Sequence, residues 1–443
     1  MGMVVKNNMS AVQTLNTLNK NSNALSKSLQ KVSSGMKING AADDASGYAI
    51  SERMRVQIRG LDQANSNTQN GNAMMKVAEG AVSSTVEILK TLKEKVISAS
   101  NDTNTDSDRQ TIQKELDQSI DQIDDNANVT YNGKYLVDGS HNSKTSATTT
   151  ALTNESFDTA TTSATKLTEL KSRTGELLHI DETDNVTVSY VKQGQTYTTT
   201  FSVGSNTLSS ILTKQAKNGA TALDAADGLE IKATAATSVI GKDGSGNTVY
   251  TADKGNAITL TAKKSGVDNQ ISGFSISITN NKGAINKSAN AVLDNFSESI
   301  RAQNESQDNS LVLQVGTKAN QAIKVGLTDM RSTALGLKGT DGSTLNVSTQ
   351  KNANAAINVL DNAVQKALDQ QTTIGSIESR LEYTSSNLTT ASENVQSSES
   401  TIRDANMAKE MTEYTKNNVL MQAAQSMLAQ ANQSSSSVLS LLQ

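Results

Sequence analysis

Two adjacent acids, Asp43 and Asp44, are the residues of this chain that most readily suggest chemistry. They lie in the glycine-rich segment S-S-G-M-K-I-N-G-A-A-D-D-A-S-G-Y-A-I, which spans Ser33–Ile50. An acid pair can hold a metal ion, and a glycine-rich loop can bind phosphate. Side chains that are adjacent in the chain diverge, however, and no histidine is close in sequence. The phosphate-loop pattern G-x-x-x-x-G-K-[ST] is also absent, so neither kind of site is expected here.

Other candidate chemistry is sparse. His141 and His179 are the only histidines, and the zinc-protease pattern H-E-x-x-H does not occur. The chain has no cysteine, which excludes thiol catalysis and iron–sulfur clusters. We therefore predict no catalytic, cofactor-binding or metal-binding residues, and a protein that is not an enzyme.

The same glycine-rich segment has a structural interpretation, as a connector between two helices. Gly35 can end the first helix in the left-handed conformation, and Asn39-Gly40 can form a turn. Asp43 or Asp44 can then cap the next helix, where free N–H groups and the helix dipole favour a negative charge. We predict this connector role.

Composition narrows the class of protein further. Of 443 residues, 35% are hydrophobic and none is proline, against about 45–50% apolar residues in ordinary domains. The absence of proline favours long uninterrupted helices. A net charge of −4 without long basic runs argues against nucleic-acid binding, and no stretch is apolar enough to span a membrane. The first residues, M-G-M-V-V-K-N-N, lack the apolar core of a secretory signal.

Heptad spacing near both ends predicts two long helices that pack as antiparallel partners in an outer bundle. The large residues of the two rows are Leu61, Met75, Val82, Leu89 and Val96, and then Ile374, Leu381, Leu388, Val395 and Ile402. The register of sevens breaks after Ile402, which predicts a domain boundary near Arg403–Asn406.

The outermost segments also have helical spacing, but each carries only one narrow apolar face. Its members are Leu18, Leu25, Leu29 and Val32 at one end, and Met407, Met411, Tyr414, Met421 and Leu428 at the other. These polar helices are marginal alone. We therefore predict that they associate with further copies of the chain.

The middle of the chain, residues 141–304, is rich in serine and threonine and reads as a β-rich insert. Its strand-like runs are N-V-T-V-S-Y-V, T-Y-T-T-T-F-S-V, A-I-T-L-T-A and F-S-I-S-I-T. The predicted fold is thus mainly α, a long antiparallel bundle built from both termini, with a variable β-rich insert. The expected domains are an inner one (1–40 and 405–443), an outer bundle with a small β element (41–140 and 305–404), and the insert (141–304).

These features together resemble the bacterial flagellins. The resemblance is carried by Ser33–Ile50 and by V-T-Y-N-G-K-Y-L-V-D-G, L-Q-V-G-T-K-A-N-Q-A-I, D-M-R-S-T-A-L-G-L, A-N-M-A-K-E-M-T-E-Y-T-K-N-N-V-L and the closing V-L-S-L-L-Q. It implies a subunit that is exported unfolded through the flagellar channel and polymerises at the tip into an extracellular filament for motility. It also implies an export chaperone, a cap and hook-associated proteins as partners. A hook–filament junction protein and an adhesive filament protein remain alternatives. In the adhesive protein Tyr190, Tyr197 and Phe201 would line a glycan site, but we expect these three aromatic residues to pack in a core instead.

The resemblance extends to a region that a host Toll-like receptor contacts in the family, at the motif L-Q-R-V-R-E-L-A-V-Q-A. Here Leu89–Ala99 reads L-K-T-L-K-E-K-V-I-S-A. Thr91 stands in place of the family's arginine and Lys95 in place of a leucine, whereas Glu115 keeps the acidic partner. We predict weak detection by that receptor, because arginine anchors dominate many interfaces.

Overall fold

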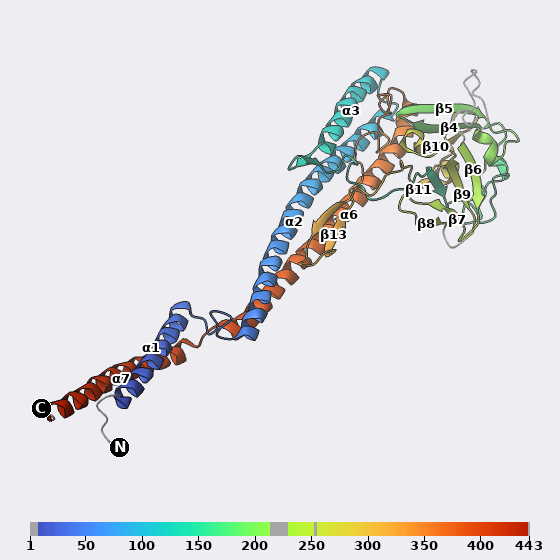
Figure 1. Ribbon diagram of the computed structural model, residues 1–443. Helices are drawn as coiled ribbons and strands as arrows, with labels where there is room; N and C mark the ends of the chain where they lie inside the picture. The colour runs from blue at the N-terminus through green and yellow to red at the C-terminus, as the bar shows by residue number, and fades with distance from the viewer. Residues whose placement is uncertain (1–7, 213–228, 252–254, 442–443) are drawn as a thin grey trace. The chain divides into compact units, whose positions relative to one another are not determined.

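The computed structural model describes residues 8–212, 229–251 and 255–441, with side chains described as far as Ser434 (Figure 1). By contacts the chain divides into two compact units. The first comprises Met1–Thr68, Gln314–Gln321 and Tyr383–Gln443, and the second comprises Gln69–Leu313 and Ala322–Glu382. The first seven residues and the side chains of the closing V-L-S-L-L-Q lie outside the described residues. The three-part division expected from the sequence stays a prediction.

Long helices form both ends of the chain, as the absence of proline and the heptad spacing predict. The α-helices are α1 (Met9–Ser34), α2 (Ala45–Ala99), α3 (Asp106–Ala127), α5 (Lys287–Leu293), α6 (Gln350–Arg403) and α7 (Met407–Leu441). Helix α2 has 55 residues and therefore extends over about 80 Å. Helix α6 ends at Arg403 and α7 begins at Met407, so a break between helices lies where the register of sevens breaks. The domain boundary expected there stays a prediction, and the residues on both sides of the break belong to the first unit.

Helices α2 and α6 run antiparallel, as predicted. In the first unit the Ser392 hydroxyl donates to Asp62 Oδ1 at 3.0 Å. In the second unit Lys93 forms an ion pair with Asp361. From the first contact to the second, the position on α2 moves forward from Asp62 to Lys93, and the position on α6 moves back by the same number of residues, from Ser392 to Asp361. The mainly α fold with an antiparallel pair from the two termini is therefore confirmed.

The heptad positions differ in how deeply a single chain buries them. Seven are buried, namely Leu61, Met75, Val82, Leu89, Val96, Ile374 and Leu381. Small residues beside them, such as Ala64 and Ala78, are buried too. Near the end of α6, Leu388, Val395 and Ile402 are only half-buried. Part of this apolar row thus remains accessible to a neighbouring molecule.

The insert is β-rich, as predicted, and its strands form two main antiparallel sheets. One sheet has the order β10-β4-β5, from β10 (Ile271–Thr279), β4 (Asn185–Lys192) and β5 (Gln195–Ser202). The other has the order β11-β3-β9-β6, from β11 (Ser297–Ile300), β3 (Ala151–Asn154), β9 (Ala257–Ala262) and β6 (Leu229–Thr234). Three small hairpins pair β1 (Thr130–Tyr131) with β2 (Lys134–Tyr135), β7 (Val239–Lys242) with β8 (Thr248–Tyr250), and β12 (Leu311–Gln314) with β13 (Ala322–Val325). The four strand-like runs in the sequence lie on β4, β5, β9 and β10, which confirms them.

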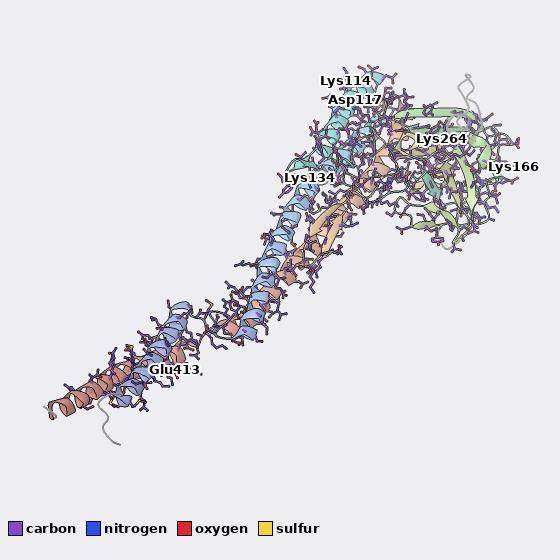
Figure 2. All side chains as sticks on the ribbon, in the orientation of Figure 1. Lys114, Asp117, Lys134, Lys166, Lys264 and Glu413 are labelled. Atoms are coloured by element: carbon purple, nitrogen blue, oxygen red, sulfur yellow. The ribbon has the colours of Figure 1, made fainter. Side chains whose placement is uncertain are left out.

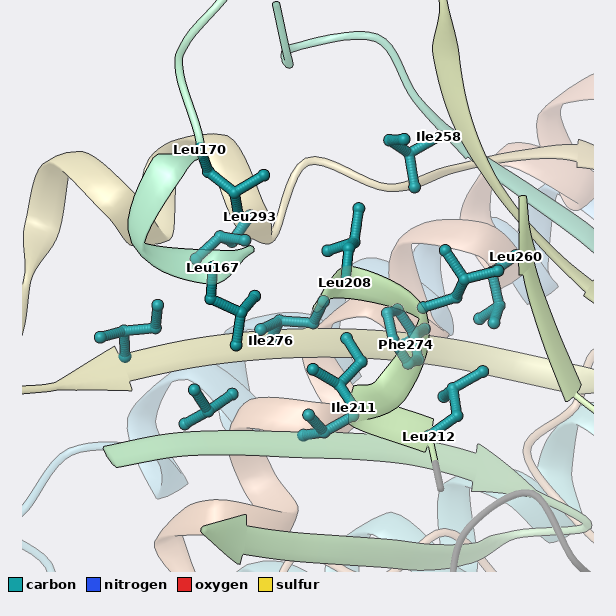
Figure 3. Close-up of a cluster of buried hydrophobic side chains, with 14 of the residues drawn as sticks. Leu167, Leu170, Leu208, Ile211, Leu212, Ile258, Leu260, Phe274, Ile276 and Leu293 are labelled. Carbon is teal, nitrogen blue, oxygen red and sulfur yellow. The ribbon is translucent and has the colours of Figure 1, made fainter. Parts of the chain in front are cut away.

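One apolar core joins the two main sheets of the insert. Alternate residues of β4 enter it, among them Val186 and Tyr190, because side chains of a strand alternate between faces. Figure 3 shows Phe274 and Ile276 of β10 beside Leu208 and other leucines and isoleucines of the short helical turns. This core gives the insert its own stability.

Two of the three aromatic residues considered for a glycan site, Tyr190 and Phe201, belong to this core. Tyr190 is 1% exposed and Phe201 is 7% exposed. Tyr197 stacks on Tyr190 with ring centroids 5.0 Å apart and remains partly exposed. The packing interpretation of Tyr190 and Phe201 is thus confirmed.

The insert rests on α6 through the backbone of β10. The Asn358 side chain donates to Phe274 O at 3.0 Å, and the Asn362 side chain donates to Ser272 O at 2.8 Å. Gly273 lies in β10 between Ser272 and Phe274, at an irregularity in the register of β10 with β4. A Cβ atom on Gly273 would lie 2.7 Å from Val359 Cγ2 and 3.0 Å from Val359 N. The close approach of strand and helix therefore requires glycine.

Substitution of Gly273 by alanine should destabilise the second unit by about 1–3 kcal/mol, because the new methyl group forces β10 away from α6. Urea unfolding of the monomer measures this. Gly375→Ala is the matched control, since nothing lies within 4 Å of its Cβ position on α6. That variant should stabilise the unit by about 0.5–1 kcal/mol through helix propensity. Equal free energies of unfolding for the two variants would contradict the close packing of β10 on α6 at Gly273.

Candidate functional site

Metal-ligand clusters and membrane-spanning helices are two features that could mark a site in the described residues. Within residues 8–212, 229–251 and 255–441, no three histidine, aspartate or glutamate side chains gather in a way that could hold a metal ion. In the same part of the chain, none of the helices has an apolar run long enough to cross a membrane. The features that stand out belong to the first unit. They are the connector between α1 and α2, and the surface of α1 and α7.

The connector begins where α1 ends. Gly35 has a φ of 71°, in the left-handed region, and its N–H donates to Lys31 O at 2.9 Å. The predicted left-handed helix end is therefore confirmed. The Asn39 N–H donates to Asp43 Oδ2 at 3.1 Å, and the Asp43 N–H donates to Gly40 O at 3.1 Å. These two hydrogen bonds close the turn at Asn39-Gly40.

Asp44, not Asp43, caps helix α2. Its Oδ1 accepts from Ser46 N at 3.1 Å and from Gly47 N at 3.0 Å. A Cβ atom on Gly47 would lie 2.5 Å from Asp44 Oδ2 and 2.7 Å from Ile38 Cδ1. The sequence left the choice between the two acids open, because either could reach free N–H groups at the start of a helix.

The connector is paired with the segment that joins α6 to α7. The Lys37 N–H donates to Arg403 O at 2.7 Å, and the Ala405 N–H donates to Gly35 O at 2.9 Å. These bonds join residues that lie more than 360 positions apart in the chain. They fix the ends of four helices in one small region of the first unit.

Arg403 is the central side chain of this joint and is only 5% exposed. Its Nη1 donates to Glu52 Oε1 at 2.6 Å, and its Nε lies 3.2 Å from the Met36 sulfur. The guanidinium also lies 5.4 Å from the centre of the Tyr48 ring. The planar guanidinium suits this combination of an ion pair and a stacking contact, whereas a lysine ammonium does not.

The charge of Arg403 acts on Glu52. The hydrogen bond from Arg403 holds the pKa of the Glu52 carboxyl below its ordinary value, with partial burial opposing and Arg55 adding to the effect. Glu52 therefore stays ionised at neutral pH. Nothing in the local sequence indicates the distant Arg403 as the partner of Glu52.

Helices α1 and α7 pair antiparallel, and hydrogen bonds between polar groups connect them. The Asn417 side chain donates to Ser28 Oγ at 2.9 Å, and the Asn21 side chain donates to Leu420 O at 3.1 Å. Among the described side chains of α1 and α7, at residues 9–34 and 407–434, only Ser28 and Ala424 are buried. On α7, Glu413 pairs with Lys416 at 3.4 Å (Figure 2). This interface alone buries little apolar surface.

Many apolar side chains of α1 and α7 remain exposed. Leu29 is 52% exposed and Met427 is 63% exposed. Further exposed members are Met9, Val12, Leu15, Met407, Met411, Val419 and Leu420. The other predicted members, Leu18, Leu25, Val32, Tyr414, Met421 and Leu428, are half-buried. We call all these residues the terminal apolar surface.

The sequence identified only part of the terminal apolar surface. Met9, Val12, Leu15, Val419, Leu420 and Met427 were missed, because one narrow stripe per helix was assumed. Their types and helical spacing were visible in the sequence, and a search for a second stripe would have found them.

The predicted host-receptor residues lie in the second unit. Thr91 is exposed on α2. Lys95 of α2 forms an ion pair with Glu115 of α3 at 3.0 Å, and both side chains are nearly half exposed. Lys95 thus pairs with Glu115, the acid on which the prediction about the receptor depends.

Family comparisons match both ends of the chain. The bacterial flagellin N-terminal helical region matches residues 5–142, and the bacterial flagellin C-terminal helical region matches residues 357–442. The chain is 34% identical to a flagellin of Clostridium tyrobutyricum, over 97% of this chain and 99% of that protein. It is 28% identical to a flagellin of Bacillus subtilis, over 99% of this chain and 100% of that protein.

Among solved structures, flagellar hook associated protein-3 from Legionella pneumophila is 14% identical over 78% of this chain and 97% of that one. Its TM-score of 0.33 is too low to carry an argument.

The role of Arg403 can be tested by hydrogen exchange. Arg403→Ala should speed exchange at the α2 amides of residues 48–54 by about tenfold or more, since a charged hydrogen bond contributes about 1.5–3 kcal/mol. Amides around Leu89 should not change. Arg59→Ala, at an exposed arginine of the same helix, is the control. The same exchange rates in both variants would show that Arg403 does not hold the joint.

Proposed function

The chain belongs to the bacterial flagellin family and is a structural subunit of the flagellar filament, and from this we propose that the terminal apolar surface drives its polymerisation. The observation that carries the proposal is the set of large apolar side chains left exposed on α1 and α7, such as Leu29 and Met427. Monomeric proteins rarely expose so many apolar side chains together. Burial of one such side chain contributes about 1.5–3 kcal/mol.

Other copies of the chain are the partner that suits this surface. The terminal helices of a neighbour carry the same apolar residues, so identical subunits can cover each other repeatedly in a helical array. The half-buried residues Leu388, Val395 and Ile402 add a second set of positions where a neighbour could pack. The connector around Arg403 would then hold the polymerising helices at a fixed place on each subunit.

We further infer that the chain is exported unfolded, assembles at the filament tip outside the cell, and meets an export chaperone, a cap and hook-associated proteins. Two features support this inference. The absence of proline and cysteine removes slow isomerisation and disulfide exchange from refolding. The terminal helices bury little apolar surface within one chain, so their unfolding before export has a low energetic cost. We also infer that the chain does not act as an enzyme.

Removal of Ala405–Gln443 should leave a soluble, folded fragment that does not polymerise. The reason is that α7 supplies half of the terminal apolar surface. Electron microscopy after salt-induced assembly, with circular dichroism as the check on folding, measures both properties. Long filaments from the truncated chain would contradict the assembly role of α7.

A point variant separates loss of apolar contact from loss of the helix. Leu29→Ser should raise the critical concentration for polymerisation by roughly tenfold, from the lost burial of one large side chain. Lys27→Ser is the matched control, because Lys27 is also exposed on α1. The proposal requires that the control polymerise as the unaltered chain does.

Weak detection by the flagellin-sensing Toll-like receptor follows from the α2–α3 surface. Thr91 lacks the several hydrogen-bond donors of an arginine. The Lys95 ammonium already forms an ion pair with the Glu115 carboxylate. A receptor that needs this acid would have to break the ion pair and bury the lysine head, which carries a desolvation penalty.

The double variant Thr91→Arg, Lys95→Leu should activate a receptor reporter at least about tenfold more strongly than the unaltered monomer. Purified monomers at matched concentrations give the comparison. The single variant Lys76→Leu, at an exposed lysine of the same helix, controls for a general gain in apolar contact. Equal potency of the double variant and the unaltered chain would refute the proposal.

A further inference from the structure

A cavity of about 420 Å³ lies in the second unit, at the point where the insert leaves the helical part. The two chain segments that lead into and out of the insert form part of its wall and are joined by the bridges Thr145–Ser306 and Thr148–Gln303. Helix α6 contributes Lys366, Gln370 and Thr373. We call this space the root cavity.

Lys366 is a cationic side chain buried at the root cavity. It is 7% exposed, and its Nζ donates to Ala334 O at 2.8 Å. Burial, together with the positive charge of Arg301, lowers the pKa of Lys366 to about 8, and the negative charges of Asp329 and Glu298 oppose this only in part. Within the described residues it takes part in none of the ion pairs, so its ammonium lacks a carboxylate at contact distance. A buried charge of this kind favours a counter-ion.

The acid that shares the cavity wall is already occupied. Arg331 Nε donates to Asp329 Oδ1 at 3.0 Å, and Arg331 Nη2 donates to Asp329 Oδ2 at 2.6 Å. This two-point pair neutralises Asp329. The charged residues that line the cavity are therefore one balanced pair and one cation, Lys366, which gives the wall a positive excess.

Gln370 adds an unpaired donor, one turn along α6 from Lys366. Its Oε1 accepts from Thr328 N at 3.2 Å and from Thr328 Oγ1 at 2.7 Å. These bonds fix the orientation of the amide and leave Nε2 without a partner, although the side chain is only 3% exposed. Buried donors are nearly always satisfied in folded proteins, so an unpaired one indicates a missing partner.

Gln303 supplies the opposite group on the insert side. Its Oε1 is buried and has no hydrogen-bond partner. Lys366, Gln370 and Gln303 all line the root cavity, which therefore has a cation and an unpaired amide N–H on α6 and an unpaired amide oxygen on the insert side. Both amide atoms are buried in the structure, so a solute would reach them only after a small rotation of these side chains. A solute that carries both an anionic oxygen and a hydroxyl group has the acceptors and the donor that these three groups require.

We propose that the root cavity binds a small anion with a phosphate or carboxylate group, held by Lys366 and Gln370 and bridged to Gln303 by a hydroxyl. Monohydrogen phosphate and hydroxycarboxylates have this chemistry, whereas acetate lacks the hydroxyl. The anion would contact both α6 and the base of the insert. Binding would therefore strengthen the attachment of the insert and raise the melting temperature of the second unit.

Isothermal titration calorimetry and thermal unfolding of the full-length monomer test the proposal, with phosphate, citrate or acetate added to a buffer that lacks all three. Phosphate or citrate should release heat and raise the melting temperature, and acetate should bind more weakly. Lys366→Met should reduce the affinity by at least about tenfold, because it removes a charged hydrogen bond. Gln370→Met tests the amide in the same way.

Lys114→Met is the matched control, because Lys114 is an exposed lysine of α3 in the same unit (Figure 2). It should bind the anion as the unaltered chain does. Lys366→Met should also melt no lower than the unaltered chain without ligand, since it removes a buried charge. If that variant fails to fold, Gln370→Met decides.

Three results would overturn the proposal. They are no binding of phosphate or citrate at millimolar concentrations, unchanged binding in both cavity variants, and an equal loss of binding in Lys114→Met. Polymerisation of Lys366→Met should remain normal, so a failure here leaves the assembly proposal untouched.

Discussion

Apolar side chains on α1 and α7 that one chain cannot bury are the constraint on which the rest of this structure depends. The two helices pair through asparagine, serine and one weak ion pair between Lys31 and Glu410, 3.9 Å apart. Such polar contacts stabilise a protein much less than the burial of large apolar side chains does. In the assembly we propose, the same residues that make the terminal helices marginal in one molecule bind the helices of neighbouring molecules. A subunit with this property can remain soluble until neighbours are present.

In the proposed assembly, the connector links the associating helices to α2 and α6. Gly35 turns the chain at the end of α1, Asp44 starts α2, and Arg403 joins both to the end of α6. The proline-free helices α2 and α6 then extend from this joint without a break. The insert has a core of its own and is attached to α6 at Gly273, so its sequence can vary without any change in the polymerising helices.

Features that depend on local sequence could be predicted, and features that depend on distant partners could not. The helix break at Arg403–Asn406, the left-handed Gly35 and the four strand runs all follow from spacing and residue type within a few positions. The choice of Asp44 as cap depends on how the turn at Gly40 closes. The ion pairs of Arg403 with Glu52 and of Lys95 with Glu115, and the root cavity itself, join residues from separate elements. No periodicity in the sequence marks such contacts.

Hydrogen exchange on the monomer and on the assembled filament, compared amide by amide, tests the central claim most directly. The account predicts fast exchange along α1 and α7 in the monomer and strong protection of the same amides in the filament. The sheets of the insert should exchange at the same rates in both states. Equal protection of α1 and α7 before and after assembly would contradict the claim that these helices depend on neighbouring copies.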